Sequence, residues 1–310
     1  MELEREGLVF REWGKGNFVR EGSKETIVFM IWPNERNLTR GAYFSIYQGI
    51  KEECINANQN LITMGIQMFD SLEVIAQTIR NLGGVISPCL LEEKMWSKLR
   101  NVPLVVVDIL PKNKKFPAIL ADNFGGAYKA TKYLMSLGHR IIAFLSIMNN
   151  EGCEPPNYLI REEGYRKALE DNSKKLFPEL IEKEQKTSTS ARRRGYEGMK
   201  KLLSLSSPPT AVLMASDSLM KGVLSAIEEF KLEVPHDISI IGFGDFPEIR
   251  ANYSLTTVRV DWKKMGKLAY QKIISLQEGK KVKPFISVIP TKLIKRASCG
   301  KRKYTKKRND

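Results

Sequence analysis

Histidine and cysteine are scarce in this sequence, and neither forms a pattern typical of a metal site. The 310 residues include two histidines and four cysteines, with no Cys-x-x-Cys pair. A structural zinc site needs such spacing, so we expect none, and we expect the thiols to stay reduced. The residues concerned are His139, His236, Cys54, Cys89, Cys153 and Cys299.

Catalytic signatures are also missing. The sequence has no nucleophile elbow, no phosphate-binding P-loop and no spacing of metal ligands. We therefore expect a protein that is not an enzyme and that needs no cofactor.

Long apolar runs are absent as well. None approaches the ~18 residues that a membrane-spanning helix requires. The chain starts MELEREGLVF, which mixes acids and bases and lacks the apolar segment of a secretory signal. We expect a cytoplasmic protein without a membrane partner.

Positive charge is what the chain has in excess. Its 50 Lys and Arg against 35 Asp and Glu give a net charge of +15, which favours polyanionic partners such as nucleic acid. Residues 299–310 form a basic tail. A solvated, disordered tail is the favoured interpretation, and a contribution to phosphate binding is the alternative.

Short apolar runs alternate with helical patterns along the chain. Strands are predicted at residues 27–32, 61–65, 83–87 and 103–108, and helices over 44–57 and 71–82, the latter capped by Ser71. Strands separated by helices indicate parallel βαβ units with helices on both faces of a sheet.

The same pattern then starts again. Asn123 is predicted to cap a helix that Gly138 stops, and strands follow at 140–146, 211–216 and 237–243, with a helix over 219–230. Two successive series predict an α/β protein of two lobes. Ligands of such sheets bind beyond the carboxyl ends of the strands, here in a cleft between the lobes.

Several motifs in this order resemble the effector-binding part of LacI/GalR transcription regulators. They are DNFGGAYKATKYLMSLGHRIIAFLS, PTAVLMASDSLMKGVLSAIEEFKLEVPHDISIIGFGDFP, LTTVRVDWKKMGKLAYQKIISLQEG and VIPTKLIKRAS. The resemblance covers residues 26–298. It implies a periplasmic-binding-protein-like (type I) fold, each lobe a parallel sheet flanked by helices. The first lobe is expected at 26–121 and 258–284, and the second at 122–257 and 285–298.

Residues 1–25 depart from that family. LEREGLVFREWGKGNFV resembles the end of a GntR-type winged helix, with residues 8–11 and 17–19 as wing strands. The tip Gly14-Lys15-Gly16 permits a tight turn, and Lys15 is a candidate phosphate contact. This hybrid resembles the arabinose-repressor group. An ordinary polar lead-in with a glycine turn is the alternative. Most of a recognition helix is missing, so we expect this chain alone to bind DNA weakly and without sequence preference.

Two charged residues lead the candidates for ligand binding. Arg161 begins REEGY, which resembles the family's R-x-x-G-[YWF] motif, whose arginine holds sugar oxygens. Asp108 ends the strand PLVVVD, where a carboxylate can accept two hydroxyl hydrogen bonds. The alternatives are a solvated helix arginine and an aspartate that caps loop amides. We expect a cleft arginine to contribute little to stability.

Further candidates come from the resemblance. Trp262 is an aromatic ligand contact or a hinge aromatic, and Tyr43 is a weaker candidate with a core role favoured. In ASDS, Ser216 offers a hydroxyl while Asp217 is expected to cap a helix.

One position departs from the family pattern. The family often places a ligand-contacting aspartate where IGFGDFP has Gly244. Either Asp245 replaces that aspartate or the ligand differs from the usual sugars.

These features predict a ligand-responsive regulator, acting as a repressor, that senses a sugar-like small molecule. A homodimer and a DNA operator, bound through the N-terminal domain, are the expected partners. A transport-type solute-binding protein is the alternative function.

Overall fold

The computed structural model describes most of the two predicted βαβ series. The described residues are 9–12, 16–19, 25–31, 41–65, 82–88, 102–110, 116–148, 155–184 and 190–302. The predicted helix from Ser71 and the loop that carries Lys15 lie outside them. Within these ranges, no helix is both long and apolar enough to cross a membrane.

The chain divides into two compact units. One comprises residues 1–120 and 261–289, and the other comprises residues 121–260 and 290–310. The chain thus leaves the first unit, builds most of the second, and returns before ending in the second. Each unit carries its own sheet, so each must bury its own apolar faces.

The first unit contains a six-stranded sheet in the order β13-β7-β6-β5-β3-β4. The pairings from β4 through β3, β5 and β6 to β7 are all parallel. Strands β3, β5 and β6 are buried along nearly their whole length, as expected for a sheet covered on both faces. Its elements are β3 (Thr26–Ile31), α2 (Gly41–Asn56), β4 (Asn60–Gly65), β5 (Gly84–Ser87), β6 (Leu104–Val107), β7 (Ala118–Ala121), α10 (Trp262–Gln277) and β13 (Ile286–Ile289).

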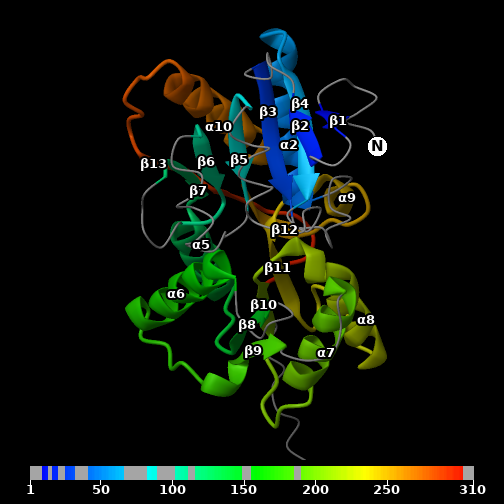
Figure 1. The fold of residues 1–310 in the computed structure, drawn as a ribbon. Coiled ribbons are helices and arrows are strands. Elements are labelled where there is room, and N and C mark those ends of the chain that lie inside the picture. Colours follow the sequence, from blue (N-terminus) through cyan, green and yellow to red (C-terminus); the bar gives the residue numbers. More distant parts are fainter. Residues whose placement is uncertain are drawn as a thin grey trace, which may run out of the picture. The chain divides into compact units, whose positions relative to one another are not determined.

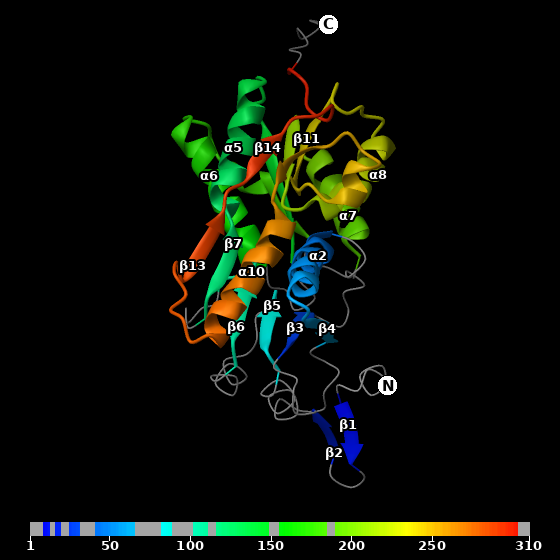
Figure 2. The ribbon, with the colours of Figure 1, turned by 90° about the horizontal axis from the view of Figure 1, so that it is seen from above.

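Helices α2 and α10 of the first unit lie side by side although they are far apart in the sequence (Figure 2). A glycine of each helix faces the backbone of the other. A Cβ at Gly49 would overlap the carbonyl of Lys263, and one at Gly266 would overlap the carbonyl of Ile46. These two glycines therefore set how closely the helices approach.

The second unit contains a six-stranded sheet in the order β14-β12-β11-β10-β8-β9. All neighbours are parallel except β14, which runs antiparallel to β12. Its elements are α5 (Asn123–Ser136), β8 (Ile142–Ile147), α6 (Pro156–Asp171), η4 (Pro178–Leu180), β9 (Ile181–Glu184), α7 (Ala191–Leu203), β10 (Ala211–Met214), η5 (Asp217–Leu219), α8 (Met220–Glu229), β11 (Ser239–Gly244), α9 (Pro247–Arg250), β12 (Thr256–Arg259) and β14 (Lys292–Ile294).

Two helix pairs flank this sheet, α5 with α6 and α7 with α8 (Figure 1). Buried Tyr165 of α6 ties its helix to the sheet, because its ring packs 5.5 Å from the Phe144 ring and its hydroxyl donates to the carbonyl of Ile142. The parallel order brings the carboxyl ends of β8, β10, β11 and β12 to one edge.

The N-terminal segment forms an antiparallel pair. Strand β1 (Val9–Glu12) pairs with β2 (Gly16–Val19), with Val9 opposite Val19 and Glu12 opposite Gly16. The two predicted wing strands therefore form a hairpin.

The start of the basic tail is packed rather than solvated, contrary to the favoured prediction. The amide of Gly300 donates to Ser239 Oγ, and the amide of Arg302 donates to the carbonyl of Leu137. Buried His139 holds the same segment, since its Nε2 lies 3.2 Å from the Gly300 carbonyl oxygen. Residues 303–310 lie outside the described part.

Candidate functional site

Arg161 is a buried side chain at the carboxyl edge of the second sheet. It lies on α6 with 3% of its surface exposed. Its Nε donates to Asn123 Oδ1 at 2.7 Å, and its Nη1 donates to the carbonyl oxygen of Ala215 at 2.5 Å, just beyond β10. The helix thus places the predicted arginine where ligands of parallel sheets bind.

Two aromatic rings hold the same guanidinium group. Its central carbon lies 3.9 Å from the centroid of Phe243, the fifth residue of β11, and 5.0 Å from that of Tyr158. Cation–π contacts strengthen as water is excluded. Arg161 is therefore a fixed, buried cation, and these contacts favour a contribution to stability that the sequence did not predict.

The helix that supplies Asn123 is capped by its neighbour. Asp122, not Asn123, is the N-cap of α5, because Asp122 Oδ1 accepts from the amide of Gly125 at 2.9 Å. Asn123 is the first residue of the helix, and its side-chain oxygen serves Arg161 instead. The predicted cap was wrong by one residue.

The cap predicted at Asp217 is provided by Ser216 instead. Ser216 Oγ caps η5 by accepting from the amide of Ser218, and it also lies 2.9 Å from Ser218 Oγ. Asp217 is fully buried and accepts from Thr257 Oγ1 at 2.7 Å and from the amide of Phe246 at 3.2 Å. Asp217 therefore joins β10, β11 and β12 rather than capping a helix.

Burial dominates the electrostatics of Asp217. Loss of solvent raises the pKa of this carboxyl to about 6, and the hydrogen bonds from Thr257 and Phe246 oppose the rise. The negative charge of Asp245 adds to it. Asp217 is thus a group whose protonation state matters to the site near neutral pH.

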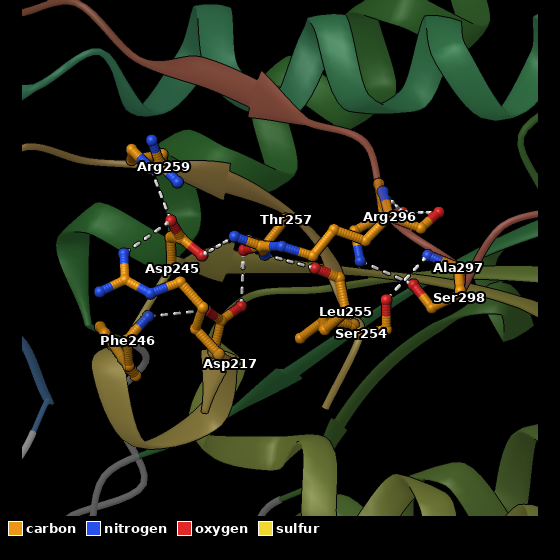
Figure 3. Close-up of polar contacts among 12 residues, drawn as sticks. Asp217, Asp245, Phe246, Ser254, Leu255, Thr257, Arg259, Arg296, Ala297 and Ser298 are labelled. Carbon is orange, nitrogen blue, oxygen red and sulfur yellow. Dashed lines mark hydrogen bonds and ion pairs between the residues drawn. The ribbon is translucent and has the colours of Figure 1, made fainter. Parts of the chain in front are cut away.

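Asp245 is surrounded by arginines (Figure 3). Arg259 Nε lies 2.5 Å from its Oδ2, Arg296 Nη2 lies 2.7 Å from its Oδ1, and Arg250 Nη1 lies 3.7 Å from Oδ2. The Asp245 side chain is 1% exposed. Its carboxylate is therefore enclosed by positive groups of the same unit.

Comparison with known proteins assigns the family. A family model described as a periplasmic binding protein-like domain matches residues 131–299, more than half of the chain. The HTH-type transcriptional repressor PurR of Histophilus somni is 30% identical over 205 residues, which are 66% of this chain and 59% of that protein. This chain belongs to the periplasmic-binding-protein-like family, in its LacI/GalR branch. It spans about three fifths of the length of that relative.

Solved LacI-type structures agree on the fold. A LacI transcriptional regulator from Bacillus cereus subsp. cytotoxis superposes with a TM-score of 0.78 at 26% identity, covering 90% of this chain and 99% of that one. A LacI family regulator from Enterococcus faecium with bound ribose gives a TM-score of 0.76 at 23% identity, covering 90% and 100%. The second likeness concerns the fold alone.

The remaining LacI-type candidates belong to the first unit. Asp108 directly follows β6, is 7% exposed, and adopts a φ of 61°, a left-handed conformation that Asp tolerates better than most residues. Trp262 is buried at the start of α10, whose cap is Asp261, and Tyr43 is half-buried in the first turn of α2. Arg161, Ser216 and Asp245 belong to the second unit. Lys15 lies outside the described residues.

Four neighbours of the predicted residues were missed from the sequence. Asn123 and Phe243 hold Arg161, while Arg259 and Arg296 hold Asp245. One signal was available, because Phe243 ends a predicted strand and such ends gather at a LacI-type site. No local sequence pattern marks Arg296, which follows β14, after the chain has returned from the first unit to the second.

Proposed function

We propose that this chain is the ligand-responsive part of a bacterial transcription regulator, acting as a repressor inside the cell. The observation that carries the proposal is Arg161, a buried cation that Asn123 and Phe243 fix at the carboxyl edge of a LacI-type sheet. A preformed polar group beside an aromatic ring suits a small molecule with hydroxyl groups. We further propose that this site binds and does not catalyse.

The proposed ligand class draws on the sugar bound by one relative. One LacI-type relative is described with bound ribose, so we propose a sugar or sugar-like effector. In the second unit Arg161 and Ser216 are the proposed contacts. Asp108, Trp262 and Tyr43 are the proposed contributions of the first unit. For Asp245 we propose a positioning role, because its carboxylate is occupied by arginines.

DNA binding is proposed for the N-terminal segment. The β1–β2 hairpin has the antiparallel pairing of a wing, and a GntR-type wing would carry Lys15 at its tip as a phosphate contact. We also propose a homodimer, since two-fold operators suit a two-fold dimer. Light scattering at micromolar concentration tests the dimer, and a purely monomeric mass would contradict it.

Ligand binding is tested by thermal shift and calorimetry. Pentoses, hexoses and their phosphates are screened on the wild type, and the best binder is titrated into Arg161→Ala. Loss of a hydrogen bond to a charged group, ~1.5–3 kcal/mol, predicts affinity about 10- to 150-fold weaker. Arg166→Ala is the matched control, because Arg166 lies on the same helix, half-exposed and paired with Glu162.

Two outcomes would overturn the proposal. The first is an absence of binding by any member of the panel, and the second is equal affinity in Arg161→Ala and Arg166→Ala. DNA footprinting then tests regulation: the protein encoded by the full open reading frame is added to operator DNA with and without the sugar. Protection of a defined operator that does not respond to the sugar would contradict a ligand-responsive repressor.

A further inference from the structure

LacI-type sequences often carry a carboxylate at the position of Gly244, the final residue of β11, and geometry excludes a side chain there. Position 244 is a glycine with a φ of 134°, a conformation that L side chains rarely adopt. A Cβ at Gly244 would lie 2.5 Å from the ring of Phe246. The aromatic ring therefore fills the space that a side chain at this position would need.

The carboxylate of the next residue, Asp245, is also inaccessible to a ligand. Asp245 is 1% exposed, and both of its oxygens face guanidinium groups. Those groups are far more accessible: the side chains of Arg259 and Arg250 are 43% and 50% exposed, and that of Arg296 is 17% exposed. A molecule that approaches this edge meets cations and not the carboxylate.

The charges in this cluster do not balance. Three guanidinium groups against the carboxylate of Asp245 leave two positive charges in excess, and one remains when buried Asp217 is ionised above its pKa of about 6. Asp217 is fully buried and accepts from Thr257 and from the amide of Phe246, so its oxygens face other groups than these arginines. Of the described residues, only Asp245 forms an ion pair with Arg250 or Arg259, and the Arg250 contact is long at 3.7 Å.

We propose that Arg259 and Arg250 form an anion subsite, and that the effector carries a phosphate monoester. The inference rests on the proposed function and narrows its ligand class from sugars to sugar phosphates. A phosphate monoester carries about −1.5 to −2 charges at pH 7, opposite in sign to the net charge of the cluster. Guanidinium groups bind phosphate through paired N–H donors, and Asp245 fixes their orientation.

Calorimetry at low salt and pH 7.5 tests the subsite. The probes are pentoses and hexoses, their monophosphates, and inorganic phosphate as a competitor. We expect one monophosphate to bind at least about tenfold more tightly than its parent sugar, because the guanidinium groups can donate charge-assisted hydrogen bonds to the phosphate. Inorganic phosphate should compete with the monophosphate and not with the parent sugar.

Variants separate the subsite from general charge. Arg259→Gln and Arg250→Gln should each weaken the monophosphate about tenfold and leave the parent sugar unchanged. Arg193→Gln is the matched control, because Arg193 is 65% exposed on α7 and pairs only loosely with Glu197 at 3.8 Å. Thermal melting without ligand confirms that each variant is folded.

The outcomes distinguish the two proposals. A parent sugar that binds as tightly as its monophosphate, with dependence on Arg161, overturns the anion subsite and leaves the proposed function standing. The same holds for a monophosphate whose affinity is equal in wild type and Arg259→Gln. Absence of binding by every sugar and every phosphate overturns both.

Discussion

Asn123 Oδ1 accepts a 2.7 Å hydrogen bond from Arg161 Nε, so the first residue of α5 and the middle of α6 hold one another at the carboxyl edge of the sheet. The contact spans 38 residues of sequence. The arginine proposed to bind ligand therefore also connects two helices of the protein itself.

Arg161→Ala is therefore expected to destabilise the protein before any ligand is added. The substitution leaves Asn123 Oδ1 and the carbonyl of Ala215 without this donor. Each buried polar group left unsatisfied costs ~1–3 kcal/mol, so we expect a loss of about 2–5 kcal/mol in the free energy of unfolding. Urea denaturation measures it, with Arg193→Ala as the control, because the Arg193 side chain is 65% exposed. Equal stability of the two variants would contradict the buried role.

Asp217→Asn is expected to change how stability depends on pH. Burial raises the pKa of Asp217 to about 6, so the folded protein holds this proton more tightly than the unfolded chain does. The carboxyl therefore stabilises the fold below its ordinary pKa range, and that stability is lost as the pH rises through about 6. Because an amide does not titrate, the free energy of unfolding of the variant lacks this contribution to its pH dependence.

The measurement is urea denaturation of both proteins at pH 4, 5, 6 and 7. Wild type should lose stability relative to Asp217→Asn over this window. Exposed Asp237→Asn serves as the control. A wild-type-to-variant difference that stays constant from pH 4 to pH 7 would show that the buried carboxyl does not titrate there.

Gly164→Ala tests the close packing of α5 against α6. A Cβ at this position would overlap the carbonyl of Phe124 in the facing helix. Because backbone has to move to relieve the overlap, we expect a loss of ~1–3 kcal/mol, despite the higher helix propensity of alanine. Thermal melting measures the effect. Glu163→Ala, exposed on the same helix, should be close to neutral, and a stabilised Gly164→Ala would refute the close approach.

His139→Ala is expected to loosen the C-terminal segment. Its Nδ1 lies 2.9 Å from Thr210 Oγ1, and its Nε2 lies 3.0 Å from Ser239 Oγ, which accepts from the amide of Gly300. Hydrogen exchange at that amide should accelerate about 10- to 100-fold, since each lost buried partner costs ~1–3 kcal/mol. Exposed His236→Ala is the control. Unchanged exchange at Gly300 would mean that the histidine does not anchor the segment.

Local pattern in the sequence determined the identity and order of most elements. Residues 27–31 and 105–107 are apolar at every position, as expected for strands covered on both faces, and Gly138, with a φ of 92°, follows the cap of α5. The resemblance of REEGY to a family motif placed Arg161 at a ligand-binding edge. Both signals depend only on neighbouring residues in the sequence, so they can be recognised without the tertiary structure.

Only the tertiary structure decided which charged residues meet at the site. Asp245 meets Arg259 and Arg296, which follow it by 14 and 51 residues, because β12 pairs with β11 and the returning β14 lies antiparallel beside β12. The order of strands in a sheet cannot be predicted from the pattern of apolar residues within each strand, because that pattern is compatible with any neighbouring strand. The sequence therefore determined which residues stand at the carboxyl edge, and only the folding of distant strands beside one another decided that Asp245 is enclosed while the arginines face outward.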